Sequence, residues 1–400
     1  MYKTYILPIH PTDQSYARKL SRAAGRIYSK TVSTVKKINE RKGIWLSEDS
    51  LKRYIRLYAA DFPLHSQSKQ AAVEEYYQNL AGYFKARESS SDLRPPYRSK
   101  KYNKVVYKKS AITHREGRLQ FSNGREGQKL EIPVKDFSGE IQYAEMIYNS
   151  YKQKYQMHII IDVSAPVQVE DQGKTLGIDL GQIHPLVSFD GSNTVIYNGG
   201  KLNSFARFKN KELARVNRKI ARCKKYSKRW RRLKRAKAFL LLKSRNKIKD
   251  VLQKYTSAVI GYCLQAGIAT IVIGELTGIR DSIDYGKKTN QNLHQWIFRK
   301  LTTMISYKAE FVGITVETVD ESYTSQDCPR CQHRSKPADR NYCCSACGFQ
   351  YHRDGVGAIN IFKKYTGSGL VEGVLTSPVG VRYSAHLCCP TEWNTSPWAG

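Results

Sequence analysis

Four cysteines near the C-terminal end of this sequence have the type and spacing of metal ligands. Cys328 and Cys331 form one C-x-x-C pair, and Cys344 and Cys347 form a second pair after twelve intervening residues. Each pair places two thiolates on one tight turn, so the four sulfurs can bind Zn²⁺ tetrahedrally and close a small ribbon. Free thiols or two disulfides are the alternative, but the N-terminal residues show no secretory signal and a reducing cytosol favours metal over disulfides. We predict a zinc ribbon over residues 325–350.

Three carboxylates stand where apolar segments end or a helix begins. Asp179 ends T-L-G-I-D, Glu275 ends A-T-I-V-I-G-E, and Asp354 opens D-G-V-G-A-I-N-I. Each acid alone is compatible with a turn or cap, but an isolated carboxylate in a hydrophobic strand is costly unless a metal or hydrogen bonds hold it. Mg²⁺ and Mn²⁺ prefer oxygen ligands, and two such ions about 4 Å apart can be shared by a few carboxylates and a phosphate. The three acids therefore predict a catalytic site for Mg²⁺ or Mn²⁺.

The charge of the chain indicates a polyanionic partner. Lys and Arg number 67 against 34 acids, a net charge of +33, and residues 201–250 hold 21 of the basic residues against two acids. This stretch reads as one or two long helices without an apolar face for a membrane surface, and aromatic residues interleave with the basic ones. A solvated surface is the alternative, but unopposed positive charge repels itself unless phosphates lie against it. The candidate nucleic-acid contacts are Arg222, Lys224, Lys225, Tyr226, Lys228, Arg229, Arg231, Arg232, Lys234 and Arg235.

The hydrophobic pattern changes along the chain and so indicates several domains. Residues 1–10 alternate like a strand, and residues 12–90 show helical spacing. From about residue 94 the chain has short alternating runs broken by Gly, Asn and Pro, which are typical of antiparallel sheet. After Thr175, buried strands alternate with the basic helices, and a helix is predicted over residues 293–312.

Four motifs, in order between Lys174 and Lys364, resemble the RuvC-type nuclease of the TnpB family, RNA-guided endonucleases of bacterial insertion sequences that are related to type V CRISPR effectors. They are G-I-D-L-G, I-G-E-L, E-S-Y-T-S-Q-D-C-P-R-C-Q-H and C-S-A-C-G-F-Q-Y-H-R-D-G-V-G-A-I-N-I. A looser likeness covers Arg94 to Lys101. The resemblance assigns the three acids to the nuclease centre and the four cysteines to the ribbon. His352 and Val356 depart from the family pattern, which commonly has an acid and an amide there.

The resemblance also implies the architecture. We expect an α+β multidomain protein with an N-terminal β-barrel-like domain that carries a helical insert, and a C-terminal ribonuclease-H-like (RuvC) α/β domain with an inserted zinc ribbon. The expected boundaries are 1–10 and 94–170 for the barrel-like domain, 11–93 for the helical recognition insert, 171–364 for the nuclease, and 365–400 for a disordered tail.

The implied function is cleavage of double-stranded DNA that matches a transposon-derived guide RNA next to a short flanking motif, by two-metal-ion phosphodiester hydrolysis. The expected partners are guide RNA and target DNA, without a membrane, in a prokaryotic cytoplasm. One alternative is an RNA-guided DNA-binding repressor with weak nuclease activity, because Val356 replaces an amide. Another is an ATPase, because G-I-D-L-G also resembles the first phosphate loop of actin-like proteins and sugar kinases; it leaves the ribbon and the charge unexplained.

Overall fold

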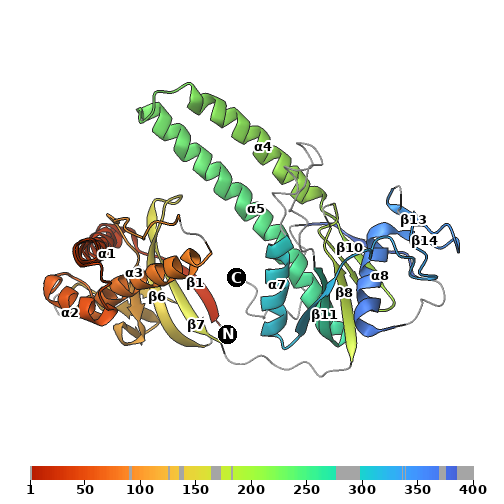
Figure 1. Ribbon diagram of the computed structural model, residues 1–400, viewed down its shortest axis with the longest axis horizontal. Coiled ribbons are helices and arrows are strands. Elements are labelled where there is room, and N and C mark those ends of the chain that lie inside the picture. Colours follow the sequence, from red (N-terminus) through yellow and green to blue (C-terminus); the bar gives the residue numbers. More distant parts are fainter. Residues whose placement is uncertain are drawn as a thin grey trace. The chain divides into compact units, whose positions relative to one another are not determined.

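The computed structural model divides into two compact units, Met1–Ser164 and Ala165–Gly400 (Figure 1). The predicted α+β class is confirmed. The predicted boundary between residues 170 and 171 lies outside the described residues. The structure describes residues 2–89, 92–124, 127–134, 139–163, 173–181, 183–275, 298–335, 337, 339–368 and 375–384.

In the first unit, three helices pack with an antiparallel sheet of strand order β1-β7-β6-β2. Alternating burial along these strands places one row of side chains, including Tyr107 and Ile159, in the core with Leu20 and Ile27 of the first helix. Gly43, in the left-handed conformation, ends that helix. The element bounds are β1 Tyr2–Pro8, α1 Gln14–Lys42, α2 Glu48–Tyr58, α3 Ser66–Arg87, β2 Val105–Lys108, β6 Glu140–Asn149 and β7 Lys154–Asp162.

A second sheet of this unit has the order β3-β4-β5. Its strands are β3 Ile112–Arg115, β4 Arg118–Phe121 and β5 Leu130–Pro133. The predicted strand at the N-terminus, the helical segment and the alternating runs are all present. In the described residues the two sheets are not joined by strand pairing, so the closed barrel stays an expectation.

The second unit is built on a sheet of order β12-β11-β8-β9-β10-β15. β8 pairs in parallel with β11 and antiparallel with β9, and β11 pairs in parallel with β12. The strands are β8 Lys174–Asp179, β9 Leu186–Phe189, β10 Thr194–Tyr197, β11 Ile268–Glu275, β12 Thr315–Asp320 and β15 Val379–Val381. Both faces of the central strands are covered, which explains why β8 and β11 read as nearly continuous apolar runs.

Different helices cover the two faces of this sheet. Side chains of α5 and α7, such as Val259 and Ile305, pack on one face against Ile178 and Ile273. On the other face, Ile359 of α8 packs against Phe189. The helices are α4 Gly200–Ala221, α5 Lys228–Ala266, α7 Phe298–Phe311 and α8 Arg353–Thr366. The predicted helix at 293–312 corresponds to α7, and its first five residues lie outside the described residues.

The prediction of a disordered tail is wrong for residues 375–384. β15 pairs in parallel with β10, the backbone of Asn198 donates to Val381, and the Tyr383 hydroxyl donates to Asp250 of α5 at 2.6 Å. A three-residue strand is too short to show periodicity, so its register depends on partners far away in the sequence. At the start of the predicted tail, Tyr365 and Thr366 belong to α8, and residues 369–374 and 385–400 lie outside the described residues.

Candidate functional site

The first two predicted acids lie at the ends of neighbouring parallel strands. Asp179 is the last residue of β8, and Glu275 is the last residue of β11. The carboxyl ends of parallel strands are the usual place for ligand sites in α/β sheets. Whether two such side chains meet depends on the face of the sheet to which each points.

Asp179 points to the face that α8 covers. Ile178 belongs to the core beneath α5 and α7, so the next side chain along the strand points the other way. A Cβ atom on Gly357 of α8 would overlap Oδ2 of Asp179. Any larger residue at this position of α8, which lies one turn after Asp354, would displace the Asp179 carboxylate.

Asp354 lies in the first turn of α8, where the helix dipole favours a carboxylate. Its Oδ2 atom is 2.7 Å from Nδ1 of His184 and 3.0 Å from Nη1 of Arg340. An ionised carboxylate only accepts hydrogen bonds, so Nδ1 of His184 carries the proton. Although burial opposes ionisation, the hydrogen bond from His184 and the charge of Arg340 lower the pKa of Asp354 below its usual value. His352 caps the helix by accepting from the Asp354 backbone N–H at 3.3 Å.

Asp179 and Asp354 lie close enough to influence each other. Burial, together with the negative charge of Asp354, raises the pKa of Asp179 to about 7. Two carboxylates in a partly buried site favour either a shared proton or a bound cation. The site is thus suited to a divalent ion, and Asp179 and Asp354, predicted as partners, are brought together.

Glu275 takes a different position from these two acids. It follows Gly274 on β11, and two residues earlier Ile273 lies in the core under α5 and α7, so the alternation directs Glu275 to that face. Its strand neighbour on β12 is Asp320, and its side chain is exposed. The structure does not bring Glu275 to Asp179.

A carboxylate that the sequence reasoning left without a role lies beside Asp179 instead. Glu321 directly follows β12, and burial together with the charge of Asp179 raises its pKa to about 8. A Cβ atom on Gly274 would lie 2.8 Å from Oε2 of Glu321 and 2.7 Å from Cδ1 of Ile361 in α8. Glu321 therefore covers the end of β11 on the Asp179 side of the sheet.

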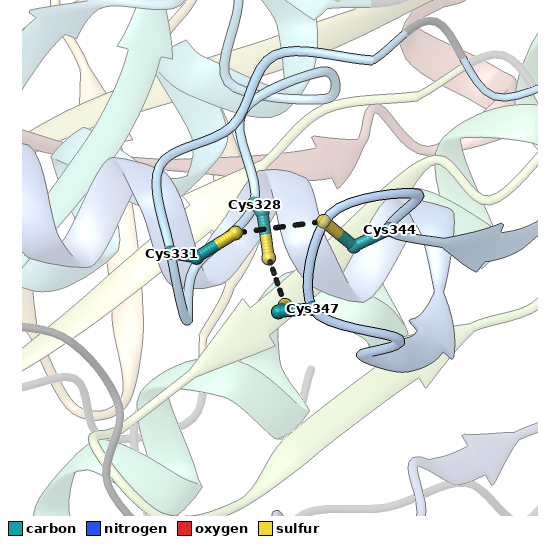
Figure 2. Close-up of side chains that lie close together, drawn as sticks. All are labelled: Cys328, Cys331, Cys344 and Cys347. Atoms are coloured by element: carbon teal, nitrogen blue, oxygen red, sulfur yellow. Dashed lines mark hydrogen bonds between the residues drawn. The ribbon is translucent and has the colours of Figure 1, made fainter.

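The four predicted cysteines form one cluster (Figure 2). Sγ of Cys328 is 3.6 Å from that of Cys347, Sγ of Cys331 is 3.5 Å from that of Cys344, and all four sulfurs lie within 4.8 Å of one another. Tetrahedral zinc with Zn–S bonds of about 2.3 Å places its sulfurs about 3.8 Å apart, so the cluster fits this ion. The neighbouring Cys343 is exposed and outside the cluster.

The ribbon is joined through α8 to the face of the sheet on which Asp179 lies. Its two strands, β13 Asn341–Cys343 and β14 Gln350–His352, pair antiparallel, and β14 runs directly into α8. Val356 is fully buried and packs with Cys328, Cys344 and Tyr342. Arg340, which contacts Asp354, is the residue before β13. The ribbon therefore places Arg340 and supports the first turn of α8.

The basic stretch forms a helical hairpin, which we define as α4, α5 and the loop 222–227 (Figure 1). All ten candidate contact residues are exposed, and none of them forms a salt bridge with another described residue. Tyr226 is 70% exposed, its ring lies 5.3 Å from that of Trp230, and Nζ of Lys234 lies 5.2 Å from the Trp230 ring. The hairpin thus presents positive charge and aromatic rings to solvent. Among the described helices none is both long and apolar enough to cross a bilayer.

Sequence reasoning missed three residues of this site: His184, Glu321 and Arg340. Each had a weak signal in the sequence. His184 lies five residues after Asp179, and Glu321 opens the E-S-Y-T-S-Q motif. Arg340 comes shortly before the second cysteine pair, in a stretch without any residue pattern that would mark a site.

Two family models match the chain, almost entirely within the second unit. Residues 158–280 match a probable transposase family, OrfB_IS605, and residues 298–361 match the family described as Cas12f1-like, TNB domain. The second match covers the ribbon and the start of α8.

Curated relatives carry related names. A TnpB-like protein of Methanocaldococcus jannaschii is 34% identical over 124 residues, which are 30% of this chain and 44% of the relative. The CRISPR-associated endodeoxyribonuclease Cas12f1 of Sulfoacidibacillus thermotolerans is 30% identical over 237 residues, 56% of this chain and 54% of the relative. The chain thus spans about half the length of the curated relatives that it matches.

Solved structures share the fold. A Cas12f1–sgRNA–target DNA complex matches with a TM-score of 0.58 at 14% identity, over 88% of this chain and 83% of that one. The mini-RNA-guided endonuclease CRISPR-Cas_phi3 matches with a TM-score of 0.51 at 11% identity, over 93% and 94% of the two chains. At these identities the likeness establishes the fold.

Proposed function

The chain belongs to the TnpB family, and on this premise we propose that it is an RNA-guided, metal-dependent endonuclease that cleaves double-stranded DNA. Base pairing with a guide RNA would select the target, so the protein itself needs surfaces that bind phosphate and a centre that hydrolyses it. The second unit would be the ribonuclease-H-like nuclease, since its first five strands in chain order, β8 to β12, lie in the sheet order 3-2-1-4-5.

The convergence of Asp179 and Asp354 at the start of α8 is the observation that carries this proposal. These two carboxylates would hold Mg²⁺ or Mn²⁺, which supplies a Lewis acid for the phosphate and an activated water. His184 and Arg340 fix Asp354 through the same oxygen and hold it ionised. The four cysteines would hold Zn²⁺ and keep Arg340 in place.

The helical hairpin would bind the nucleic acid. Its exposed basic side chains and the Tyr226–Trp230 pair offer phosphate contacts and stacking surfaces along one projection. The expected ligands are the guide RNA and the target DNA.

Plasmid cleavage tests the proposal. The protein is purified with the RNA that it binds, the RNA is sequenced to define its guide, and a plasmid with the matching site is incubated with Mg²⁺ or Mn²⁺. We expect linear product from the wild type and a loss of at least about a hundredfold in rate for Asp179→Asn, because one carboxylate that binds the metal is removed. Unchanged cutting by Asp179→Asn would contradict the site.

A guided DNA-binding repressor with weak nuclease activity is the second candidate. The position of Glu275 favours it, because this acid, one of the three metal ligands that the sequence predicts, points to the opposite face of the sheet from Asp179. Binding to matched DNA without nicking, in either metal, would select this alternative.

A further inference from the structure

We propose that Glu321 is the third carboxylate of the metal centre and takes the place that the sequence assigns to Glu275. This inference rests on the proposed nuclease function and names a further residue of the same site. Three observations support it. They are the alternation of side chains along β11 and β12, the position of the Glu321 carboxylate, and the lack of a hydrogen-bond partner for its Oε2 atom among the described residues.

The alternation of side chains along β11 and β12 determines which acids point to the same face of the sheet as Asp179. Ile273 pairs with Ile178 on β8, and both side chains lie under α5 and α7, so the next position on each strand, Gly274 and Asp179, points to α8. Glu275 follows Gly274 and therefore points back to the face that α5 and α7 cover. On β12, Val319 pairs with Gly274 and shares its face, and two residues later Glu321 points the same way.

The end of β11 has no side chain on the α8 side, and Glu321 fills this space. Its Cδ and Oε2 atoms lie 3.3 Å and 2.8 Å from the point where a Cβ of Gly274 would be. Neighbouring strands are about 4.8 Å apart, so Glu321 lies above the strand next to Asp179. α8 covers both positions, with Gly357 against Asp179 and Ile361 against Gly274.

Among the residues that the structure describes, one oxygen of the Glu321 carboxylate has no partner that would explain its position. Its Oε2 atom is buried and has no hydrogen-bond partner among the described residues. Buried polar atoms are nearly always paired, and a buried carboxylate is costly without a proton or a cation. The charged groups around it are Asp179, Asp320 and Lys364, and the Lys364 Nζ donates to the backbone oxygens of Asp320 and Ser322. A divalent ion bound between Glu321 and Asp179 would satisfy both acids.

Manganese binding gives a test that does not depend on cleavage. The full-length chain is freed of RNA by nuclease digestion, loaded with zinc, and titrated with Mn²⁺ while free Mn²⁺ is followed by electron paramagnetic resonance. We expect Glu321→Gln and Asp179→Asn to weaken Mn²⁺ binding at least about tenfold, because each removes one charged ligand. Glu275→Gln should change it less than about threefold, as should Glu317→Gln, an exposed acid of β12 that serves as the matched control.

Cleavage with the guide RNA is the second readout. Glu321→Gln should lose at least about a hundredfold in rate, while Glu275→Gln should stay within about threefold of the wild type. Glu321→Gln should fold, since it removes an unpaired buried charge, and its unfolding temperature without Mn²⁺ should equal or exceed that of the wild type. Glu321→Asp keeps the charge on a shorter side chain and should recover part of the Mn²⁺ affinity.

The outcomes separate this inference from the proposed function. If Glu275→Gln loses Mn²⁺ and cleavage while Glu321→Gln keeps both, the assignment of Glu321 is overturned and the nuclease stands. If the wild type cuts no matched DNA but Glu321→Gln still loses Mn²⁺, the metal ligand is supported and the proposed function fails.

Discussion

At the scale of single residues, the two acids of the centre are prepared in opposite ways. Asp354 is held ionised by His184 and Arg340, whereas burial and the charge of Asp354 raise the pKa of Asp179 to about 7. Asp354 is therefore already ionised and can bind a cation directly, whereas Asp179 must release a proton when it binds one. This difference has a consequence for stability that does not require nucleic acid.

Without added divalent metal, the fold should lose stability as the pH rises from about 4 to 8. The folded-state pKa of Asp179 lies above the value of about 3.9 for an unfolded chain, so the folded state binds the proton more tightly and ionisation opposes folding. Asp179→Asn removes this contribution, and its unfolding temperature should fall less between pH 5 and pH 8 than that of the wild type. Thermal unfolding of zinc-loaded protein measures both, with Glu317→Gln as a control that keeps the wild-type slope. Equal slopes in wild type and Asp179→Asn would show that Asp179 is not perturbed.

The sequence shows where a strand or helix ends, but it does not show to which face of the sheet the last side chain of a buried strand points. This difference determines which of these residues could be predicted. Asp179 and Asp354 end a strand and open a helix, and both positions are visible in the residue pattern. Glu275 also ends a strand, but the apolar run I-V-I-G-E is buried on both faces and its sequence does not show to which face its last side chain points. Glu321 reaches the site only because Gly274 leaves space above β11, which is a property of the packed sheet.

At the scale of elements, the ribbon and α8 act as one piece. The cysteine spacing predicted the four-sulfur cluster correctly because its ligands are close in sequence, on two tight turns. The contact between ribbon and helix was not predictable in this way. Val356, which the sequence marks as a departure from the family pattern, is a core residue between them rather than part of the metal centre.

Val356→Asn should therefore destabilise the protein without improving the nuclease. The amide would be buried against Cys328, Cys344 and Tyr342, and a buried polar group without partners costs about 1–3 kcal/mol. We expect a lower unfolding temperature and a cleavage rate at or below that of the wild type. Val356→Ala is the control, because it loses apolar contacts without adding a polar group. A faster nuclease in Val356→Asn would place this position in the metal centre after all.

At the scale of the whole molecule, the charge is distributed unevenly. The sequence predicted a basic helical segment, and the structure resolves it into the helical hairpin, whose ten candidate residues have no salt-bridge partners in the described part of the chain. Elsewhere basic residues are often paired, as Lys104 is with Glu145 and Lys108 is with Glu74. The unpaired charges of the hairpin are therefore the ones most available to phosphates.

Removing charge from the hairpin should weaken nucleic-acid binding more than removing the same charge elsewhere. A variant with Lys224, Lys225, Lys228 and Arg229 changed to Gln loses four phosphate contacts if the hairpin binds the backbone. The dependence of log Kd on log salt should then become shallower by about 3 to 4, because fewer counterions are released on binding. Changing Arg115, Lys129, Lys152 and Lys154 to Gln lowers the net charge equally, and these exposed residues lie outside both the hairpin and the expected recognition insert, so this variant is the matched control. Fluorescence anisotropy with the copurified guide RNA at several salt concentrations measures both, and equal losses in the two variants would mean that net charge, not the hairpin, drives binding.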